Sequence, residues 1–163
     1  MADQDTDMQP LANGADTAPA VGLVSQYIKD MSFENPNSPA VYQKQTPPAV
    51  DVQFNIAAAQ VADDLHEVVL KVDVRAEVEG QVAFLVELSY AGLFGFRNVP
   101  AEQIQPYLLG EAPRLVFPFC RRVLADAVRD GGFPPLLLEP IDFNTLYLQS
   151  QESQAQQGVA GQA

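Results

Sequence analysis

The feature that most restricts how this chain can fold is a change in the spacing of its apolar residues near Phe94. From Ala49 to that point apolar and polar residues alternate, which is the period of β-strands with one buried face. The alternating segments are residues 50–56, 68–78 and 82–90. Beyond Phe94 the period becomes helical. This order predicts an α+β fold, in which helices lie on one side of an antiparallel sheet.

Two connections indicate how the strands are joined. Only the short link "EGQ" around Gly80 separates the second and third alternating segments, and so short a link closes only as an antiparallel hairpin. A further strand is predicted over residues 21–28, ahead of prolines at 36, 39, 47 and 48 that interrupt strand pairing. Residues 29–48 then form a long crossover between strands 1 and 2 of a four-stranded sheet, and loops of that length are more often functional than idle.

The segment after the strands predicts helices. "PAEQIQPYLL" is expected to form a short helix that ends before Gly110, and Pro113 to open a longer one with an apolar face. Either Phe119 or Cys120 belongs to that face. Pro118 either kinks the longer helix or marks its true first turn.

The ends of the chain differ from its middle in composition. Residues 1–20 are acidic and lack the apolar stretch of a signal peptide, so we expect a disordered tail. Residues 21–150 form the expected domain, and Asp142 is a good N-cap for a last helix that passes through Leu148. Residues 151–163 are rich in Gln and are expected to be a flexible tail. No run reaches the roughly 18 apolar residues of a membrane span, which argues against direct membrane insertion.

The net charge and the single cysteine indicate which partners and which cellular compartment suit this protein. The chain has 21 acidic against 9 basic residues, a net charge of −12 that repels nucleic acid and anionic lipid. Acidity favours a basic partner, although solubility alone also explains it. A lone Cys120 is compatible with a reducing cytoplasm. Both faces of the predicted sheet carry apolar residues, including Val69 and Leu85 opposite the core face, so a homo-oligomer is expected.

A catalytic or metal site is not indicated. His66 has Asp63, Asp64 and Glu67 near it, but neighbours on a strand point to opposite faces and do not converge on one ion. Cys120 is expected to act as a small apolar residue without a partner base. The sequence has no phosphate-binding glycine loop or nucleophile motif, so it predicts a protein that is not an enzyme and needs no cofactor.

Several longer motifs carry a resemblance to a known family. The segments are "KDMSFENPNSP", "YQKQ", "ADDLHEVVLKVDV", "AFLVEL" and "LVFPFCRRVLADAVRDGGFPPLLLEPIDFNTLYLQ". Together they resemble the SecB protein-export chaperones, in the family's order, over roughly residues 21–150. The resemblance implies a homotetramer, built as a dimer of dimers, of subunits with the sheet and crossover described above.

The resemblance also implies a function. SecB proteins hold newly made precursor proteins unfolded in the cytoplasm of Gram-negative bacteria, without ATP, and deliver them to the SecA motor. Such a holdase needs a long apolar groove, because many weak contacts retain unrelated chains without a shared sequence.

Two sets of site residues follow from the resemblance. The groove for unfolded clients is expected to include Tyr27, Phe33, Val50, Val52, Phe54, Leu146 and Tyr147. The face that binds the basic, zinc-bearing C-terminal tail of SecA is expected to include Asp30, Glu34, Leu85 and Glu87. Zinc belongs to that partner and not to this chain.

The sequence departs from the family pattern at two places. Thr46 stands where the family often has tryptophan, which weakens one aromatic wall of the groove, and Glu152 is the single acid of the C-terminal tail. An alternative is a dedicated adaptor that binds one folded partner. A role in a toxin–antitoxin system in place of export is also left open by the sequence.

Overall fold

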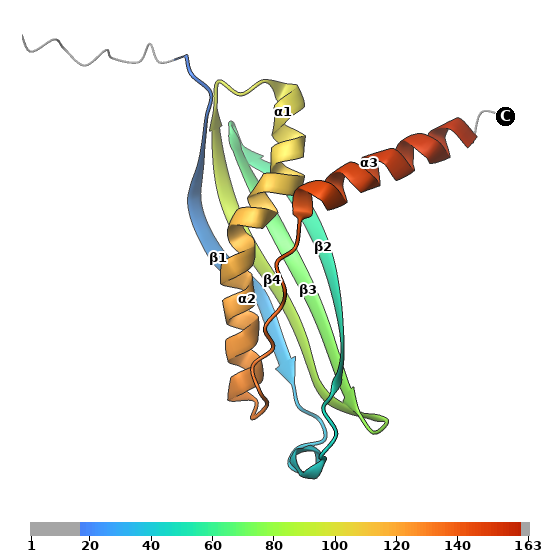
Figure 1. Cartoon of the computed structure of the whole chain (residues 1–163). Helices are drawn as coiled ribbons and strands as arrows, with labels where there is room; N and C mark the ends of the chain where they lie inside the picture. Colours follow the sequence, from blue (N-terminus) through green and yellow to red (C-terminus); the bar gives the residue numbers. More distant parts are fainter. Residues whose placement is uncertain (1–16, 161–163) are drawn as a thin grey trace, which may run out of the picture.

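The computed structural model describes residues 17–160, whose strands form one antiparallel sheet with α1 and α2 across one face (Figure 1). The strands are β1 (Ala20–Glu34), β2 (Ala49–Ala62), β3 (Leu65–Val78) and β4 (Gln81–Arg97). Their spatial order is β1-β4-β3-β2, so that the first two strands in sequence are the two edges of the sheet. The predicted α+β class, the four antiparallel strands and the crossover between strands 1 and 2 are confirmed.

Tight turns join β2 to β3 and β3 to β4. Glu79 and Gly80 both have positive φ, at 49° and 78°, which is the conformation of a two-residue hairpin turn that matches the twist of the strands. Asp64 has a φ of 57° in the other turn, and its carbonyl accepts a hydrogen bond of 2.8 Å from the Phe96 amide. The predicted hairpin around Gly80 is confirmed.

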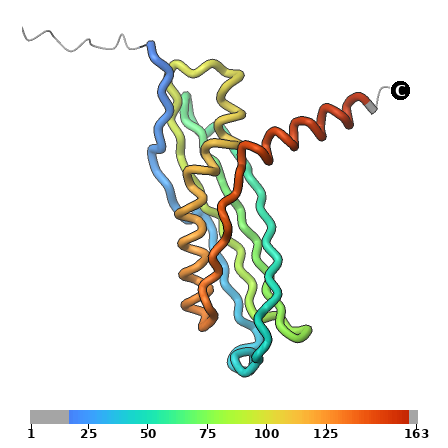
Figure 2. The backbone as a smooth tube through the Cα atoms, viewed as in Figure 1, coloured from blue at the N-terminus to red at the C-terminus, as the bar shows by residue number. Residues whose placement is uncertain are grey.

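The first strand is longer than predicted, and the crossover is shorter. β1 continues past Ile28 to Glu34, so the acidic and aromatic segment after Lys29 is paired with β4 and is not part of the loop. The expectation that the crossover begins at Lys29 was wrong. It spans residues 35–48 and contains the 3-10 helix η1 (Ala40–Gln43). Figure 2 shows this loop at the same end of the sheet as the β3–β4 hairpin.

Helix α1 (Ala101–Pro106), the π-helical turn η2 (Tyr107–Glu111) and α2 (Ala112–Asp130) follow one another without a break. The expected helix end before Gly110 was therefore wrong, because the π turn carries the helical backbone through that residue. Pro118 lies inside α2, and the helix continues past it.

The core lies between α2 and the middle strands. Cys120 and Leu124 of α2 are fully buried, whereas Phe119 is 39% exposed, which decides for Cys120 between the two residues considered for the apolar face. On the sheet side alternate positions of β3 and β4 are buried, namely Val68, Leu70, Val72, Val74, Ala76, Val78, Phe84, Val86, Leu88, Tyr90, Phe94 and Phe96, together with Ala83 and Ala91.

Helix α3 (Phe143–Ala160) leaves the body of the molecule at an angle (Figure 1). The predicted N-cap is confirmed, since the Thr145 amide donates a hydrogen bond of 3.0 Å to Asp142 Oδ1. The helix continues to Ala160, beyond residue 151, where a flexible tail was expected to begin. The expected N-terminal tail lies almost wholly outside the described residues. Among those described, no helix has the length and apolar character to cross a bilayer.

Candidate functional site

The face of the sheet opposite the helices carries the four residues expected to bind a motor protein. Glu34 of β1 pairs with Leu85 of β4, and Asp30 pairs with Ser89, two positions beyond Glu87. These side chains share one face because β4 alternates, with Val86 and Leu88 pointing into the core. The structure thus brings Asp30, Glu34, Leu85 and Glu87 together on one surface, hereafter the polar face.

A β-bulge in β1 decides which side chains reach the polar face. Ile28 pairs with Tyr90, on the helix side, while Asp30 pairs with Ser89, on the polar side, and Lys29 is the extra residue between them. If Lys29 were instead paired in regular alternation, Asp30 and Glu34 would point toward the helices. The bulge therefore reverses the alternation of β1 between Ile28 and Asp30; a second register shift lies between Leu23 and Ser25.

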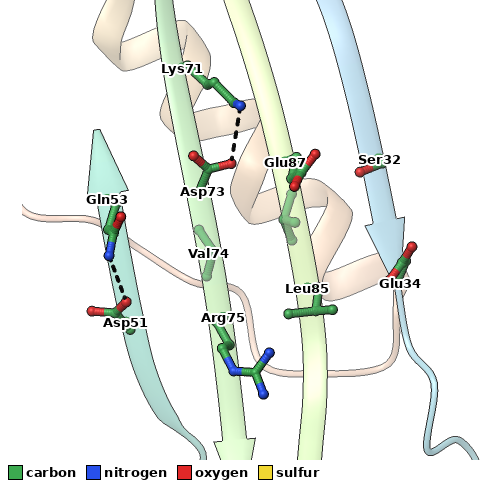
Figure 3. Close-up of a pocket in the computed structure, with 11 residues that line it drawn as sticks. Ser32, Glu34, Asp51, Gln53, Lys71, Asp73, Val74, Arg75, Leu85 and Glu87 are labelled. Atoms are coloured by element: carbon green, nitrogen blue, oxygen red, sulfur yellow. Dashed lines mark hydrogen bonds and ion pairs between the residues drawn. The ribbon is translucent and has the colours of Figure 1, made fainter. Parts of the chain in front are cut away.

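A depression of about 440 Å³ lies on the polar face (Figure 3). Three of the expected motor-binding residues line it, namely Glu34, Leu85 and Glu87, whereas Asp30 is not among its lining residues. The remaining lining residues are Ser32, Asp51, Gln53, Lys71, Asp73, Val74, Arg75 and Val86. Sequence reasoning did not assign a role to the charged members of this second set, although their alternation with buried residues of β2 and β3 places them on this face.

The charges in the depression are mixed but negative in sum. Lys71 Nζ lies 3.9 Å from Asp73 Oδ1, and Gln53 Nε2 donates a hydrogen bond of 3.5 Å to Asp51 (Figure 3). Both the lysine and the aspartate of that pair are nearly half exposed, so water screens them and the pair adds little stability. The carboxylates of the depression outnumber its cations, which favours a basic ligand that also contacts Leu85.

On the helix side, β2 presents a row of incompletely covered apolar residues. Val50, Val52 and Phe54 pair with core residues of β3, namely Ala76, Val74 and Val72. Because β2 is an edge strand, α2 covers this row only partly. Val50 is 41% exposed, and Val52 and Phe54 are half-buried.

Aromatic rings continue this row at the crossover end. Phe33 stacks on Phe84 with ring centroids 6.2 Å apart, Phe84 lies 4.9 Å from Phe133, and Phe133 lies 5.4 Å from Tyr42. An apolar depression of about 340 Å³ is lined here by Val41, Tyr42, Lys44, Gln45, Thr46, Pro47, Pro48, Val78, Gly132, Phe133 and Pro134. Sequence reasoning missed Tyr42 and Phe133, which only the fold brings together. Thr46, the residue at the family's tryptophan position, is one of the lining residues.

The remaining residues assigned to a client groove are divided between two places. Leu146 is 48% exposed, and Tyr147 is half-buried; both are on α3, whose first residue, Phe143, packs on Phe117 of α2 at 5.6 Å. Phe117 in turn lies 6.3 Å from Phe54 of β2, which links the start of α3 to the apolar row. Tyr27 lies elsewhere.

Tyr27 is on the far side of the sheet from the apolar row. It precedes the bulge, and its hydroxyl donates a short hydrogen bond to the Glu67 carboxylate, which also pairs with Lys29. The Lys29 ammonium, more than the Tyr27 hydroxyl, holds the pKa of Glu67 below its usual range. The structure therefore groups Tyr27 with the polar face and not with Phe33.

The residues considered for catalysis are separated or shielded. Cys120 is fully buried, and this burial raises the pKa of its thiol to about 12. His66 lies edge-on to Phe96 at 5.2 Å on the helix side, whereas Glu67 points to the polar face. Among residues 17–160 no cluster of three or more His, Cys, Asp or Glu side chains has the geometry to hold a metal ion.

Comparisons with a family model and with known proteins point to the same family. The family model described as "Preprotein translocase subunit SecB" matches residues 14–154. "Protein-export protein SecB" of Sphingopyxis alaskensis is 64% identical over 151 residues, which cover 93% of this chain and 86% of that relative. The protein of the same name from Zymomonas mobilis is 61% identical over 145 residues, covering 88% of each chain.

A solved structure agrees with the fold. A SecB-like chaperone of Mycobacterium tuberculosis, determined in complex with a peptide from an antitoxin, is 16% identical and has a TM-score of 0.62. The match covers 74% of this chain and 90% of the other, and at that identity it shows a shared fold. With sequence relatives aligned over most of its length and a matching architecture, the chain belongs to the SecB family.

Proposed function

We propose that this protein is an ATP-independent cytoplasmic chaperone that binds unfolded precursor proteins and delivers them to the SecA motor. The observation that carries the proposal is the separation of two surfaces on opposite sides of one sheet. The helix side has an uncovered apolar row on β2 that runs into an aromatic depression. The other side has a negatively charged depression with Leu85 in its lining.

The apolar row suits capture of non-native chains. Its residues belong to an edge strand and to loop segments, so they form an open strip and not an enclosed pocket. A folded protein has already buried the apolar surface that such a strip would contact, which makes the chaperone select for folding state. The strip requires no nucleotide, because release follows from transfer of the client to another protein.

The polar face suits a docking function. A basic tail, such as the zinc-bearing C-terminal tail of SecA, would pair with Asp30, Glu34 and Glu87 and cover Leu85. Since this surface and the apolar row are on opposite sides of the sheet, one subunit would hold a client and the motor at the same time. We further propose that the working form is a homotetramer, a dimer of dimers.

The first experiment compares folding states. Purified protein is mixed with a precursor protein in its unfolded form and, separately, in its folded form, and binding to each is measured by calorimetry. We expect capture of the unfolded form only, and equal binding to both would overturn the proposal. A dedicated adaptor, the competing function, would bind one folded partner and would not be displaced by unrelated unfolded proteins.

A second experiment separates the two surfaces. Asp30→Asn with Glu34→Gln should abolish binding of SecA and leave suppression of client aggregation intact. Glu139→Gln with Glu152→Gln is the matched control, because it removes the same charge from residues outside the polar face. Unchanged SecA binding in the first pair of substitutions would discredit the docking assignment.

A third experiment addresses the apolar row with residues that are already exposed. Val50→Ser with Leu146→Ser removes apolar contacts at positions 41% and 48% exposed, so folding should tolerate both changes. Client affinity should fall while SecA binding is retained. Val159→Ser, at a position 78% exposed near the end of α3, is the control for loss of an exposed apolar side chain. Equal client affinity in the two proteins would contradict the groove assignment.

A further inference from the structure

The junction between the π turn and α3 contains an unusually close approach of two segments. Gly110 is buried in the π turn η2, and a Cβ atom at this position would lie 2.2 Å from Asn144 Oδ1 and 3.1 Å from Asn144 Cγ. Side chains essentially never approach so closely, so glycine is required here for space. The nearest backbone atom is Asn144 Cα at 3.5 Å, an ordinary contact distance. The obstacle is therefore the Asn144 side chain alone.

Neighbouring interactions hold the Asn144 side chain in place. It forms a hydrogen bond with the Glu111 carboxylate, which also accepts a 2.9 Å hydrogen bond from Arg114 Nε. The arginine, more than Asn144, holds the pKa of Glu111 below its usual range. Since Glu111 is the last residue of the π turn, both Gly110 and its neighbour contact the first turn of α3.

The first turn of α3 is also held by a buried aromatic residue and by a helix N-cap. Phe143 is 1% exposed and packs on Phe117, and Asp142 caps the helix through Thr145. Beyond this turn, α3 extends away from the sheet (Figure 1), and its residues as far as Val159 are exposed apart from Tyr147. An 18-residue helix is about 27 Å long, so a small change at its first turn becomes a large displacement farther along.

The π turn η2 supplies part of the surface that contacts α3. A π turn adds a residue to the helical register and often marks a functional position in a helix. Here it directs Gly110 and Glu111 toward α3, while α2, which follows directly, directs Phe117 toward Phe54. One continuous helical segment thus contacts both the apolar row of β2 and the start of α3.

From this geometry we infer that the close approach of Gly110 to the Asn144 side chain positions the first turn of α3, which carries Leu146 and Tyr147, relative to the apolar row of β2, and so controls how tightly an unfolded client is held. Gly110 is the positioning residue and acts through α3, whereas the Asn144 side chain is the group that a larger residue at position 110 would displace. The inference rests on the proposed function of the apolar row. Beyond that function, the inference identifies Gly110 as a residue that sets the position of α3 relative to the apolar row.

The central test is Gly110→Ala with a compensating substitution. The added methyl group should displace α3, and client affinity should fall about tenfold, as expected for the loss of roughly one buried leucine-sized contact. Asn144→Ala removes both atoms nearest the methyl group, so Gly110→Ala with Asn144→Ala should restore the helix position and the affinity. A merely destabilising effect of Gly110→Ala would not be rescued in this way.

Two further variants serve as controls for this test. Gly158→Ala is the matched control, because this glycine is also in a helix and a Cβ there would have no atom within 4 Å. Asn144→Ala alone tests whether the Glu111 hydrogen bond is needed, and its affinity should stay within twofold of the parent protein. Thermal unfolding of every variant is recorded, so that loss of fold is distinguished from displacement of α3.

The helix position is measured independently of client binding. Spin labels at Asn55→Cys on β2 and Ser150→Cys on α3 report their separation, with buried Cys120 protected from labelling. The inference is supported if Gly110→Ala changes both the separation and client affinity and the double variant restores both. It is overturned if Gly110→Ala changes neither, or if the separation is restored without the affinity. Should the parent protein retain no unfolded precursor, the proposed function fails, and the spin-label distances still decide whether Gly110 and Asn144 seat the helix.

Discussion

The buried thiol of Cys120 provides a quantitative test of the core, because it is the only cysteine in the chain. It is fully buried between α2 and the sheet, and burial raises its pKa from an ordinary value of 9.0 to about 12. A difference of about three pKa units lowers the thiolate fraction at pH 8 by about a thousandfold. Since the thiolate is the reacting species, alkylation of the folded protein should be slower by at least that factor.

The assay is alkylation by iodoacetamide at pH 8, followed by mass spectrometry of the intact protein. The same protein in concentrated urea provides the reference rate for an exposed thiol. Burial adds a second factor, since the reagent reaches the sulfur only when α2 separates from the sheet. Labelling should therefore accelerate steeply through the unfolding transition. A folded-state rate within about tenfold of the urea rate would refute both the burial of Cys120 and the packing of α2 on the sheet.

Three other substitutions test different parts of the structure. Leu124→Ala, at a fully buried site, should lower the free energy of unfolding in urea by about 2–5 kcal/mol, whereas Leu137→Ala, at a site 74% exposed, should change it little. Gly131→Ala places a Cβ 2.2 Å from the Phe33 ring and should cost about 1–3 kcal/mol, recovered in part when Phe33→Leu is added; no loss would contradict the contact. Because the folded-state pKa of Glu67 is lowered, its charge stabilises the protein above about pH 4.5 and this contribution is lost at lower pH. The stability advantage over Glu67→Gln should thus be constant near neutral pH and shrink in acid, and an advantage independent of pH would argue against the Lys29 and Tyr27 contacts.

Local patterns predicted most of the sheet and its helical cover. Alternation identified the buried face of β3 and β4, since the pleat turns successive side chains to opposite faces regardless of what packs on them. The Gly80 hairpin and the Asp142 cap also depend only on nearby residues. The prolines after the first strand indicated the crossover, and the resemblance of long motifs to a known family supplied the expected site residues.

The errors occurred where distant segments decide local structure. The loop was predicted from Lys29 because prolines follow, but pairing with β4 extends β1 to Glu34. The assignment of Tyr27 to the groove stays a prediction, although the bulge at Lys29 places this residue on the side of the sheet opposite Phe33. A helix end was expected before Gly110, whereas contact with α3 accompanies a π turn at that point.

The sequence by itself determined the buried face of β3 and β4, where the central hairpin turns and where the last helix begins, because these follow from spacings of a few residues. Only the tertiary structure decided that a bulge at Lys29 places Asp30 and Glu34 on the polar face, that Tyr42 and Phe133 share a depression with Thr46, and that Gly110 lies against Asn144. The physical reason is that a bulge or a close approach is stabilised by its partner segment, and the partner lies far away along the chain.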